Sequence, residues 1–132
     1  MSLKTWKKEF YPVPASKVSK ENAVAHSLKK WQGLTKTNLK KHSVIHDVDH
    51  NKITDGKDFL GIEASSCALC CHHYESGPGC PTCPLSIARG VVECASCTPR
   101  EETAPYSYWV FHSNPAPMIR WLKKALKAES KA

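Results

Sequence analysis

The pattern of apolar and polar residues predicts helices at both ends of the chain. Val24, Leu28 and Trp31 stand at i, i+4 and i+7, so a helix from Ser19 to Gln32 would bury one apolar face. Gly33 follows directly and is expected to end this helix, because glycine is the usual residue beyond a helix C-terminus. A shorter helix is predicted over residues 35–42. The two would form a helical hairpin with a lysine-rich outer face.

The last predicted helix covers residues 117–128. Its first residue is a proline, which suits the first helical position. Apolar residues recur at the i, i+3, i+4, i+7 and i+8 positions of this segment, namely Met118, Trp121, Leu122, Ala125 and Leu126. Such a stripe is more typical of a core-facing helix than of a partner-binding surface.

The middle of the chain has a different pattern. Residues 43–46 and 58–63 are short strand-like runs, and the turn residues Asp55 and Gly56 lie between them. This arrangement predicts a β-hairpin. The aromatic run Tyr106–His112 is expected to form one more strand.

Together these elements predict an α+β fold, a small zinc-stapled single domain spanning residues 1–132. Its parts would be an N-terminal basic helical part, a β-hairpin, a cysteine-rich metal segment, and a final loop or strand with the C-terminal helix, at 1–42, 43–66, 67–97 and 98–132 respectively. A chain of this length can bury a substantial core, so metal need not carry the whole fold.

The cysteine segment carries the strongest chemical signal. Three Cys-x-x-Cys pairs occur, at Cys67/Cys70, Cys80/Cys83 and Cys94/Cys97. Two intervening residues let a tight turn direct both sulfurs at one ion, and structural zinc takes four thiolate or imidazole ligands. The predicted metal ligands are Cys67, Cys70, Cys80, Cys83 and Cys94, with Cys71, Cys97, His72 and His73 as secondary candidates.

Several arrangements of this site are open. One zinc ion could take the first two pairs, or one thiol of the first group together with Cys80, Cys83 and Cys94. Two zinc ions would need eight ligands, and therefore also Cys71 and a histidine. An iron–sulfur cluster is the alternative cofactor, since Cys83 precedes a proline as in ferredoxins, although the overall spacing differs from theirs.

Charge is unevenly distributed. Residues 1–42 carry ten lysines and two glutamates, residues 43–112 have a net charge of −5, and residues 113–132 have a net charge of +4. A basic end can meet nucleic acid or an acidic protein surface, and it can equally be a solvated helix face. The candidate contact residues are Lys29, Lys30, Lys36, Lys40 and Lys41.

Residues 46–58 hold further polar clusters. Residues 47–58 place carboxylates at several calcium-loop positions, but Lys52 stands where that loop needs glycine, which favours a polar hairpin loop. His46, Asp47, Asp49 and His50 offer a minor possibility of a nuclease site.

The chain begins without a signal-like apolar segment and has no stretch of membrane-spanning length, so it is expected to be intracellular, with no membrane partner. Seven cysteines in a reducing compartment are more typical of metal binding than of disulfides.

The chain also resembles small cysteine-rich proteins of bacteriophages and prophages. The resemblance rests on Tyr11-Pro-Val-Pro, Ala25-His-Ser-Leu-Lys-Lys-Trp-Gln-Gly-Leu, Cys67-Ala-Leu-Cys, Cys80-Pro-Thr-Cys-Pro-Leu, Cys94, Pro105-Tyr and Met118-Ile-Arg-Trp-Leu. It implies that Cys80, Cys83 and Cys94 belong together, and that the protein acts in the cytoplasm of a bacterial host.

These observations lead to two hypotheses. The first is a non-enzymatic zinc-binding module that binds a host protein or nucleic acid, with no small-molecule substrate evident. The second is a metal-dependent enzyme, such as a nuclease, or an iron–sulfur redox protein. A sulfur-rich site without an adjacent general base favours a structural metal and hence the first hypothesis.

Overall fold

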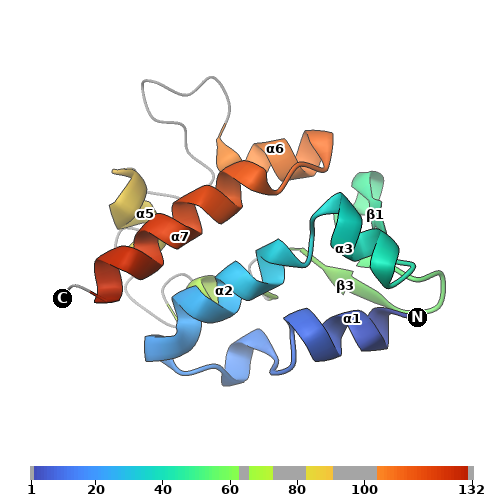
Figure 1. Cartoon of the computed structure of the whole chain (residues 1–132), viewed down its shortest axis with the longest axis horizontal. Coiled ribbons are helices and arrows are strands. Elements are labelled where there is room, and N and C mark those ends of the chain that lie inside the picture. The colour runs from blue at the N-terminus through green and yellow to red at the C-terminus, as the bar shows by residue number, and fades with distance from the viewer. Residues whose placement is uncertain (1, 63–65, 73–82, 91–103, 131–132) are drawn as a thin grey trace.

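The computed structural model describes residues 2–62, 66–72, 83–90 and 104–130. They form a small, mostly helical α+β domain with a three-stranded antiparallel sheet (Figure 1). The elements are α1 (Leu3–Phe10), α2 (Ala23–Gln32), α3 (Lys36–Lys41), β1 (Ile45–Asp47), β2 (Lys52–Thr54), β3 (Phe59–Gly61), α4 (Ala68–Cys70), α5 (Pro84–Arg89), α6 (Pro105–His112) and α7 (Ala116–Ser130). Single 3₁₀ turns cover Ala15–Lys17, Lys20–Asn22 and Val48–His50.

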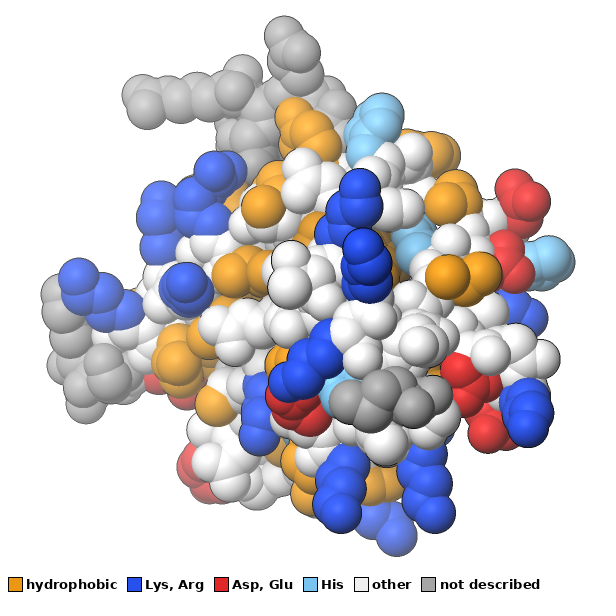
Figure 2. Space-filling view, turned by 45° about the vertical axis from the view of Figure 1, so that its right-hand side comes forward, with side chains coloured by type: hydrophobic (Ala, Val, Ile, Leu, Met, Phe, Trp, Pro, Cys, Tyr) orange, Lys and Arg blue, Asp and Glu red, His pale blue; other side chains and the backbone are white. Residues whose placement is uncertain are grey.

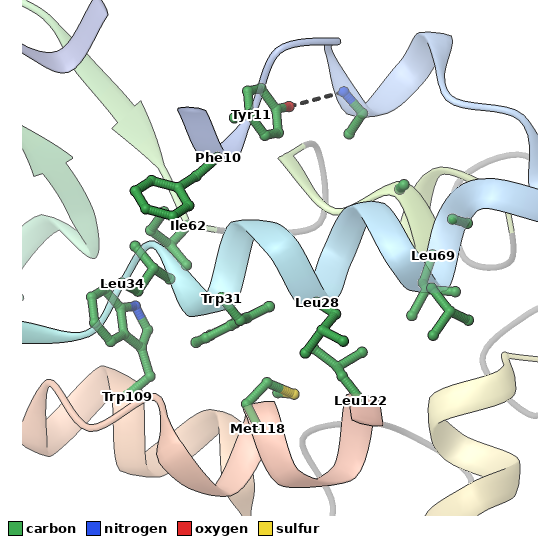
Figure 3. Packing of buried hydrophobic residues seen from close by; sticks show 14 of the residues in the cluster. Phe10, Tyr11, Leu28, Trp31, Leu34, Ile62, Leu69, Trp109, Met118 and Leu122 are labelled. Atoms are coloured by element: carbon green, nitrogen blue, oxygen red, sulfur yellow. Dashed lines mark hydrogen bonds between the residues drawn. The ribbon is translucent and has the colours of Figure 1, made fainter. Parts of the chain in front are cut away.

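The core forms mainly between α2 and α7. Figure 3 shows Leu28 and Trp31 of α2 facing Met118 and Leu122 of α7, and all four side chains are buried. The apolar stripes predicted for these two helices therefore pack against each other. Burying side chains of this size stabilises the fold by about 1.5–3 kcal/mol each.

The predicted helices agree with the observed ones apart from their exact ends. Residues Lys20–Asn22 form a separate 3₁₀ turn before α2. Helix α3 begins after Thr35, whose hydroxyl accepts a hydrogen bond from the Asn38 amide, and its Leu39 is buried. Among the described residues, no helix combines the length and the apolar character needed to cross a membrane.

Helix α1 was not predicted. Ser2 caps it by accepting a hydrogen bond from the Thr5 amide, and Leu3, Trp6 and Phe10 bury its inner face. The Trp6 indole donates a hydrogen bond of 2.8 Å to the carbonyl oxygen of Gly33, at the end of α2. The N-terminal part therefore contains three helices and not a two-helix hairpin.

The sheet differs from the predicted hairpin. The two predicted strand segments do not pair with each other, because β2 lies between them and pairs antiparallel with both. Strand β2 came from the stretch expected to be loop, and its central residue Ile53 is fully buried. The turn at Asp55 and Gly56 is present, but it connects β2 to β3.

The aromatic run before α7 is a helix and not the predicted strand. Pro105 occupies the first turn of α6, and Ser113 ends it in the left-handed conformation with φ 53°. The alternation of aromatic residues favoured a strand, but burial of Trp109 against α2 decides the outcome. Its ring meets Trp31 edge-on, with 5.8 Å between the ring centroids.

Candidate functional site

The first Cys-x-x-Cys pair forms a tight turn beside α2. Cys67 precedes the single helical turn α4, and the Cys71 amide donates a hydrogen bond to the Cys67 carbonyl at 3.0 Å. The Cys67 sulfur accepts hydrogen bonds from both the thiol and the backbone amide of Cys70. These bonds, together with the nearby Lys30 ammonium group, hold the pKa of the Cys67 thiol well below its usual range. The turn thus favours a thiolate, the form that binds metal.

Lys30 corrects a prediction. It was expected to be a surface contact residue, but its side chain is only 1% exposed. Its Nζ donates hydrogen bonds to the carbonyl oxygen and hydroxyl of Ser66, at 3.1 and 3.5 Å, directly before the cysteine turn. A buried ammonium group needs a compensating negative charge or acceptors, and here it lies where thiolates would gather.

Other polar groups of α2 and its neighbours surround this turn. The Ser27 hydroxyl is 3.8 Å from the Cys67 sulfur. Burial raises the pKa of Tyr11, whose hydroxyl accepts a hydrogen bond from the Ala15 amide, and the charges of Cys71 and Cys67 raise it further. The turn therefore lies within the packed structure.

The remaining candidate ligands do not complete a site among the described residues. Cys71 is buried, and Cys83 is buried directly before α5. Within the described part of the chain, no group of three potential metal ligands comes together. The other candidates lie outside the described residues: Cys80, Cys94, Cys97 and His73. The Cys67–Cys70 pair fits half of a tetrahedral thiolate site.

His72 has a structural role in this arrangement. Its Nε2 is hydrogen-bonded to the carbonyl oxygen of Val18, and His26 bonds the carbonyl oxygen of Val13 in the same way, at 2.7 Å. The two rings therefore fasten the proline-containing segment 12–18 to the body of the protein. Burial lowers the pKa of His26.

The predicted contact lysines have different surroundings. Lys29, Lys36 and Lys40 are exposed. Lys41 is also exposed but forms an ion pair of 3.1 Å with Glu9 of α1. Three of the five lysines are thus surface cations without a carboxylate partner among the described residues.

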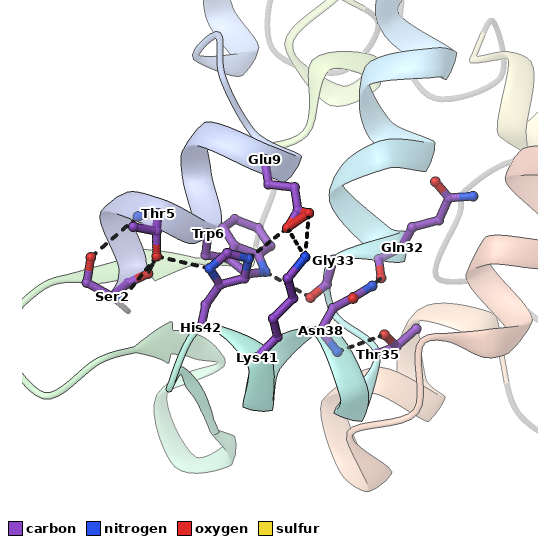
Figure 4. A network of polar contacts seen from close by, with 10 residues as sticks. All are labelled: Ser2, Thr5, Trp6, Glu9, Gln32, Gly33, Thr35, Asn38, Lys41 and His42. Carbon is purple, nitrogen blue, oxygen red and sulfur yellow. Dashed lines mark hydrogen bonds and ion pairs between the residues drawn. The ribbon is translucent and has the colours of Figure 1, made fainter.

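Figure 4 shows the polar network around this ion pair. Glu9 lies 2.8 Å from Nε2 of His42, and the Thr5 hydroxyl lies 2.9 Å from Nδ1 of the same ring. A carboxylate, an imidazole and a hydroxyl in a row resemble a hydrolase triad. However, the Thr5 hydroxyl also contacts the backbone of Ser2 within the helix cap, and His42 is buried. The network therefore joins α1 to α3.

The residues considered for a nuclease site point in different directions. His50 lies 3.0 Å from Asp47. His46 instead stacks on Trp109, with 3.8 Å between ring centroids, and lies 2.8 Å from the Ser113 hydroxyl. Asn51 was not predicted to matter, yet its side chain contacts the Trp109 indole and the carbonyl oxygen of Ile62.

The stretch 47–58, predicted as a polar hairpin loop, contains strand β2, and its residues 55–58 form the turn between β2 and β3. The Asp55 carboxylate accepts hydrogen bonds from the amides of Lys57, Asp58 and Leu3, each at 2.9 Å. These bonds lower the pKa of Asp55 to about 2. The carboxylate therefore closes the β2–β3 turn and holds the start of α1. This use of its oxygens argues against a calcium ligand.

Comparison of the chain with protein-family models, with curated proteins and with solved structures found no match.

Proposed function

We propose that this protein is a non-enzymatic module that holds a structural zinc ion in its cysteine segment and binds a nucleic acid or a host protein through its basic surface. The observation that carries the proposal is the Cys67–Cys70 turn, in which a lowered thiol pKa and a buried Lys30 occur together. Zinc bound by four thiolates carries a net charge of −2, and a buried ammonium group beside it would offset part of that charge.

The proposed ligands are Cys67, Cys70, Cys80 and Cys83, and the alternative set takes one thiol of the first group with Cys80, Cys83 and Cys94. Four protein ligands close the coordination sphere, which is typical of structural zinc and leaves no position for a substrate. The metal would join the turn beside α2 to the segment that leads into α5. Its chemical contribution would be folding energy rather than catalysis.

Elemental analysis of anaerobically purified protein, together with its absorption spectrum, tests the metal. We expect about one equivalent of zinc and no visible absorption. Cys67→Ser and Cys80→Ser should each release the metal, while Ser66→Ala, adjacent to the turn, should retain it. Iron in the elemental analysis together with visible absorption would show that the cofactor is an iron–sulfur cluster and not zinc. Unchanged zinc in both cysteine variants would refute the ligand assignment.

The binding role is supported by the exposed cations Lys29, Lys36 and Lys40. Titration with DNA at several salt concentrations separates the two partner classes. A nucleic-acid partner predicts affinity that falls steeply with salt, because phosphate contacts release counterions. Absence of binding at low salt, together with co-purification of one acidic host protein, would assign the surface to a protein partner.

A further inference from the structure

A groove of about 720 Å³ lies between α3, β1 and the end of α6. Its polar rim is formed by Lys36, Lys40, Ser43, His46, His112 and Ser113, and its floor is apolar. Figure 2 looks towards the end of the molecule that carries α3 and β1, where lysine and histidine side chains stand beside hydrophobic ones. The groove is far from the cysteine turn, since Figure 3 shows Trp109 and Leu69 at opposite ends of α2.

The charge of the groove is one-sided. Lys36 and Lys40 are exposed and lie one helical turn apart on α3, a spacing that puts both on the same face. Among the described residues, no carboxylate lines the groove and neither lysine belongs to a salt bridge. The rim is therefore complementary to an anion with at least two negative groups or with a repeating one.

One wall of the groove carries the His46 imidazole, which is stacked on the buried Trp109 ring. Trp109 is fully buried and covers one face of the His46 imidazole, with an interplanar angle of 18°. His46 is held in its own plane by the Ser113 hydroxyl at 2.8 Å and by the Asn51 side chain at 3.4 Å. His46 lines the groove, and because Trp109 covers one face of its ring, a base in the groove would stack on the other face. A planar base could continue this stack.

Three residues near the ring have a left-handed backbone where a helix or turn ends. Within the described residues, the non-glycine residues with positive φ are Ser43, Asn51 and Ser113, at 56°, 46° and 53°. Two of them line the groove, and the third holds His46.

The groove is open rather than enclosed. Lys36, Lys40, Ser43, Ile45 and His112 are all exposed, although they line it. Sites for free small molecules usually bury 70–90% of the ligand, which this groove cannot do. A segment of a longer polymer needs only one side covered.

We propose that this groove binds single-stranded nucleic acid, with phosphates at Lys36 and Lys40 and one base stacked on His46. The inference rests on the proposed function for the existence of a binding role and deepens it by naming the partner. Aromatic side chains and a cationic track are the usual combination for unpaired strands. A duplex offers its phosphates to the lysines but keeps its bases stacked away from the ring.

Fluorescence anisotropy with labelled 12-nucleotide single-stranded DNA and RNA tests the proposal. We expect Lys36→Ala/Lys40→Ala to weaken binding and to flatten the slope of log affinity against log salt by about 1.4, at about 0.7 per phosphate contact. The matched control is Lys4→Ala/Lys8→Ala, an exposed pair with the same spacing and charge on α1. Equal losses in both double variants would overturn the site.

The stacking step has its own test. His46→Ala should weaken binding by about 5- to 150-fold, as loss of one stacked base does. His46→Phe keeps the ring without its hydrogen bonds and should restore most of the affinity. Thermal unfolding of each variant shows whether it is folded. Folded His46→Ala with unchanged affinity, or tighter binding of the matching duplex, would refute the proposal.

Two further experiments distinguish the strand from other anionic ligands and test the zinc proposal separately. A free nucleotide or a glutamate-rich peptide that competes as well as the strand, at equal concentration of anionic groups, would also refute it. Cys67→Ser/Cys70→Ser reports on the zinc proposal independently. Loss of metal with retained strand binding supports both proposals, whereas absence of metal from the natural protein with groove-dependent binding removes the zinc proposal alone.

Discussion

Replacement of Lys30 by methionine separates a metal-compensating charge from a purely structural one. Methionine has a similar length and no charge, so the packing of the side chain is largely kept. The substitution removes the ammonium group that donates to Ser66 and lies near the Cys67 thiol. The exposed neighbour Lys29 provides the control, because Lys29→Met removes the same charge from the surface of the same helix.

The expected effect on stability is small when metal is absent. Loss of a hydrogen bond from a charged donor costs about 1.5–3 kcal/mol. Against this, replacing a buried charge by an apolar side chain is often neutral or stabilising by about 1–4 kcal/mol. The two contributions have opposite signs and similar size. The free energy of unfolding of the metal-free protein should therefore change by less than about 2 kcal/mol.

The expected effect on zinc binding is larger. Groups that surround metal ligands contribute about 10- to 100-fold to metal affinity, which corresponds to about 1.4–2.7 kcal/mol. Competition titration with a zinc chelator measures this affinity, and urea unfolding in excess chelator measures the metal-free stability. Lys30→Met should lose zinc affinity, and Lys29→Met should not. Unchanged zinc affinity together with a metal-free protein destabilised by more than 2 kcal/mol would show that Lys30 serves only the fold.

The other predictions concern the scaffold. Gly33→Ala should destabilise the protein by about 1–2 kcal/mol in urea unfolding, because a methyl group there would lie 2.5 Å from Cγ of Phe10, and this overpacking outweighs the entropic gain from removing a glycine. Gly90→Ala should cost about 1 kcal/mol through its φ of 70°, since no atom of the described residues lies within 4 Å of the added methyl group. The pKa of Glu9 is lowered from its ordinary 4.5 and that of Asp55 is lowered to about 2, so each carboxylate stabilises the fold while it is ionised. The melting temperature should therefore fall as the pH is lowered from about 4.5 towards 2. Glu9→Gln and Asp55→Ala should each flatten that dependence, and a wild-type curve that stays flat over this range would contradict it.

Local signals in the sequence, such as apolar periodicity and terminal residues, correctly predicted helices α2, α3 and α7. The helix predicted over residues 35–42 corresponds to α3, and Met118, Leu122 and Ala125 of the predicted stripe on α7 are buried, as expected. Gly33 does follow α2, but for a different reason than predicted. Its φ of −69° is ordinary, so the close approach of Phe10 and not a left-handed turn requires glycine there.

Tertiary contacts decided the elements that were predicted wrongly. The run Tyr106–His112 has the composition of a strand, yet it is helical because Trp109 reaches Trp31 from α6. The signal for α1 was present in the spacing of Leu3, Trp6 and Phe10, and was overlooked among its lysines. No local pattern could show that Lys30 is buried, because its acceptor Ser66 is 36 residues away.

The two proposed sites share α2 but do not depend on each other. Lys30 and Trp31 are consecutive on this helix, and they point to Ser66 beside the cysteine turn and to Trp109 beneath His46. Coupling between them would require α2 to have two alternative positions that each site favours differently. The packing of Leu28 and Trp31 against α7 fixes α2 without any metal. Loss of metal should therefore loosen the turn at Cys67 while the groove keeps its shape, and the proposed zinc site would fasten the chain locally and would not act as a switch for binding.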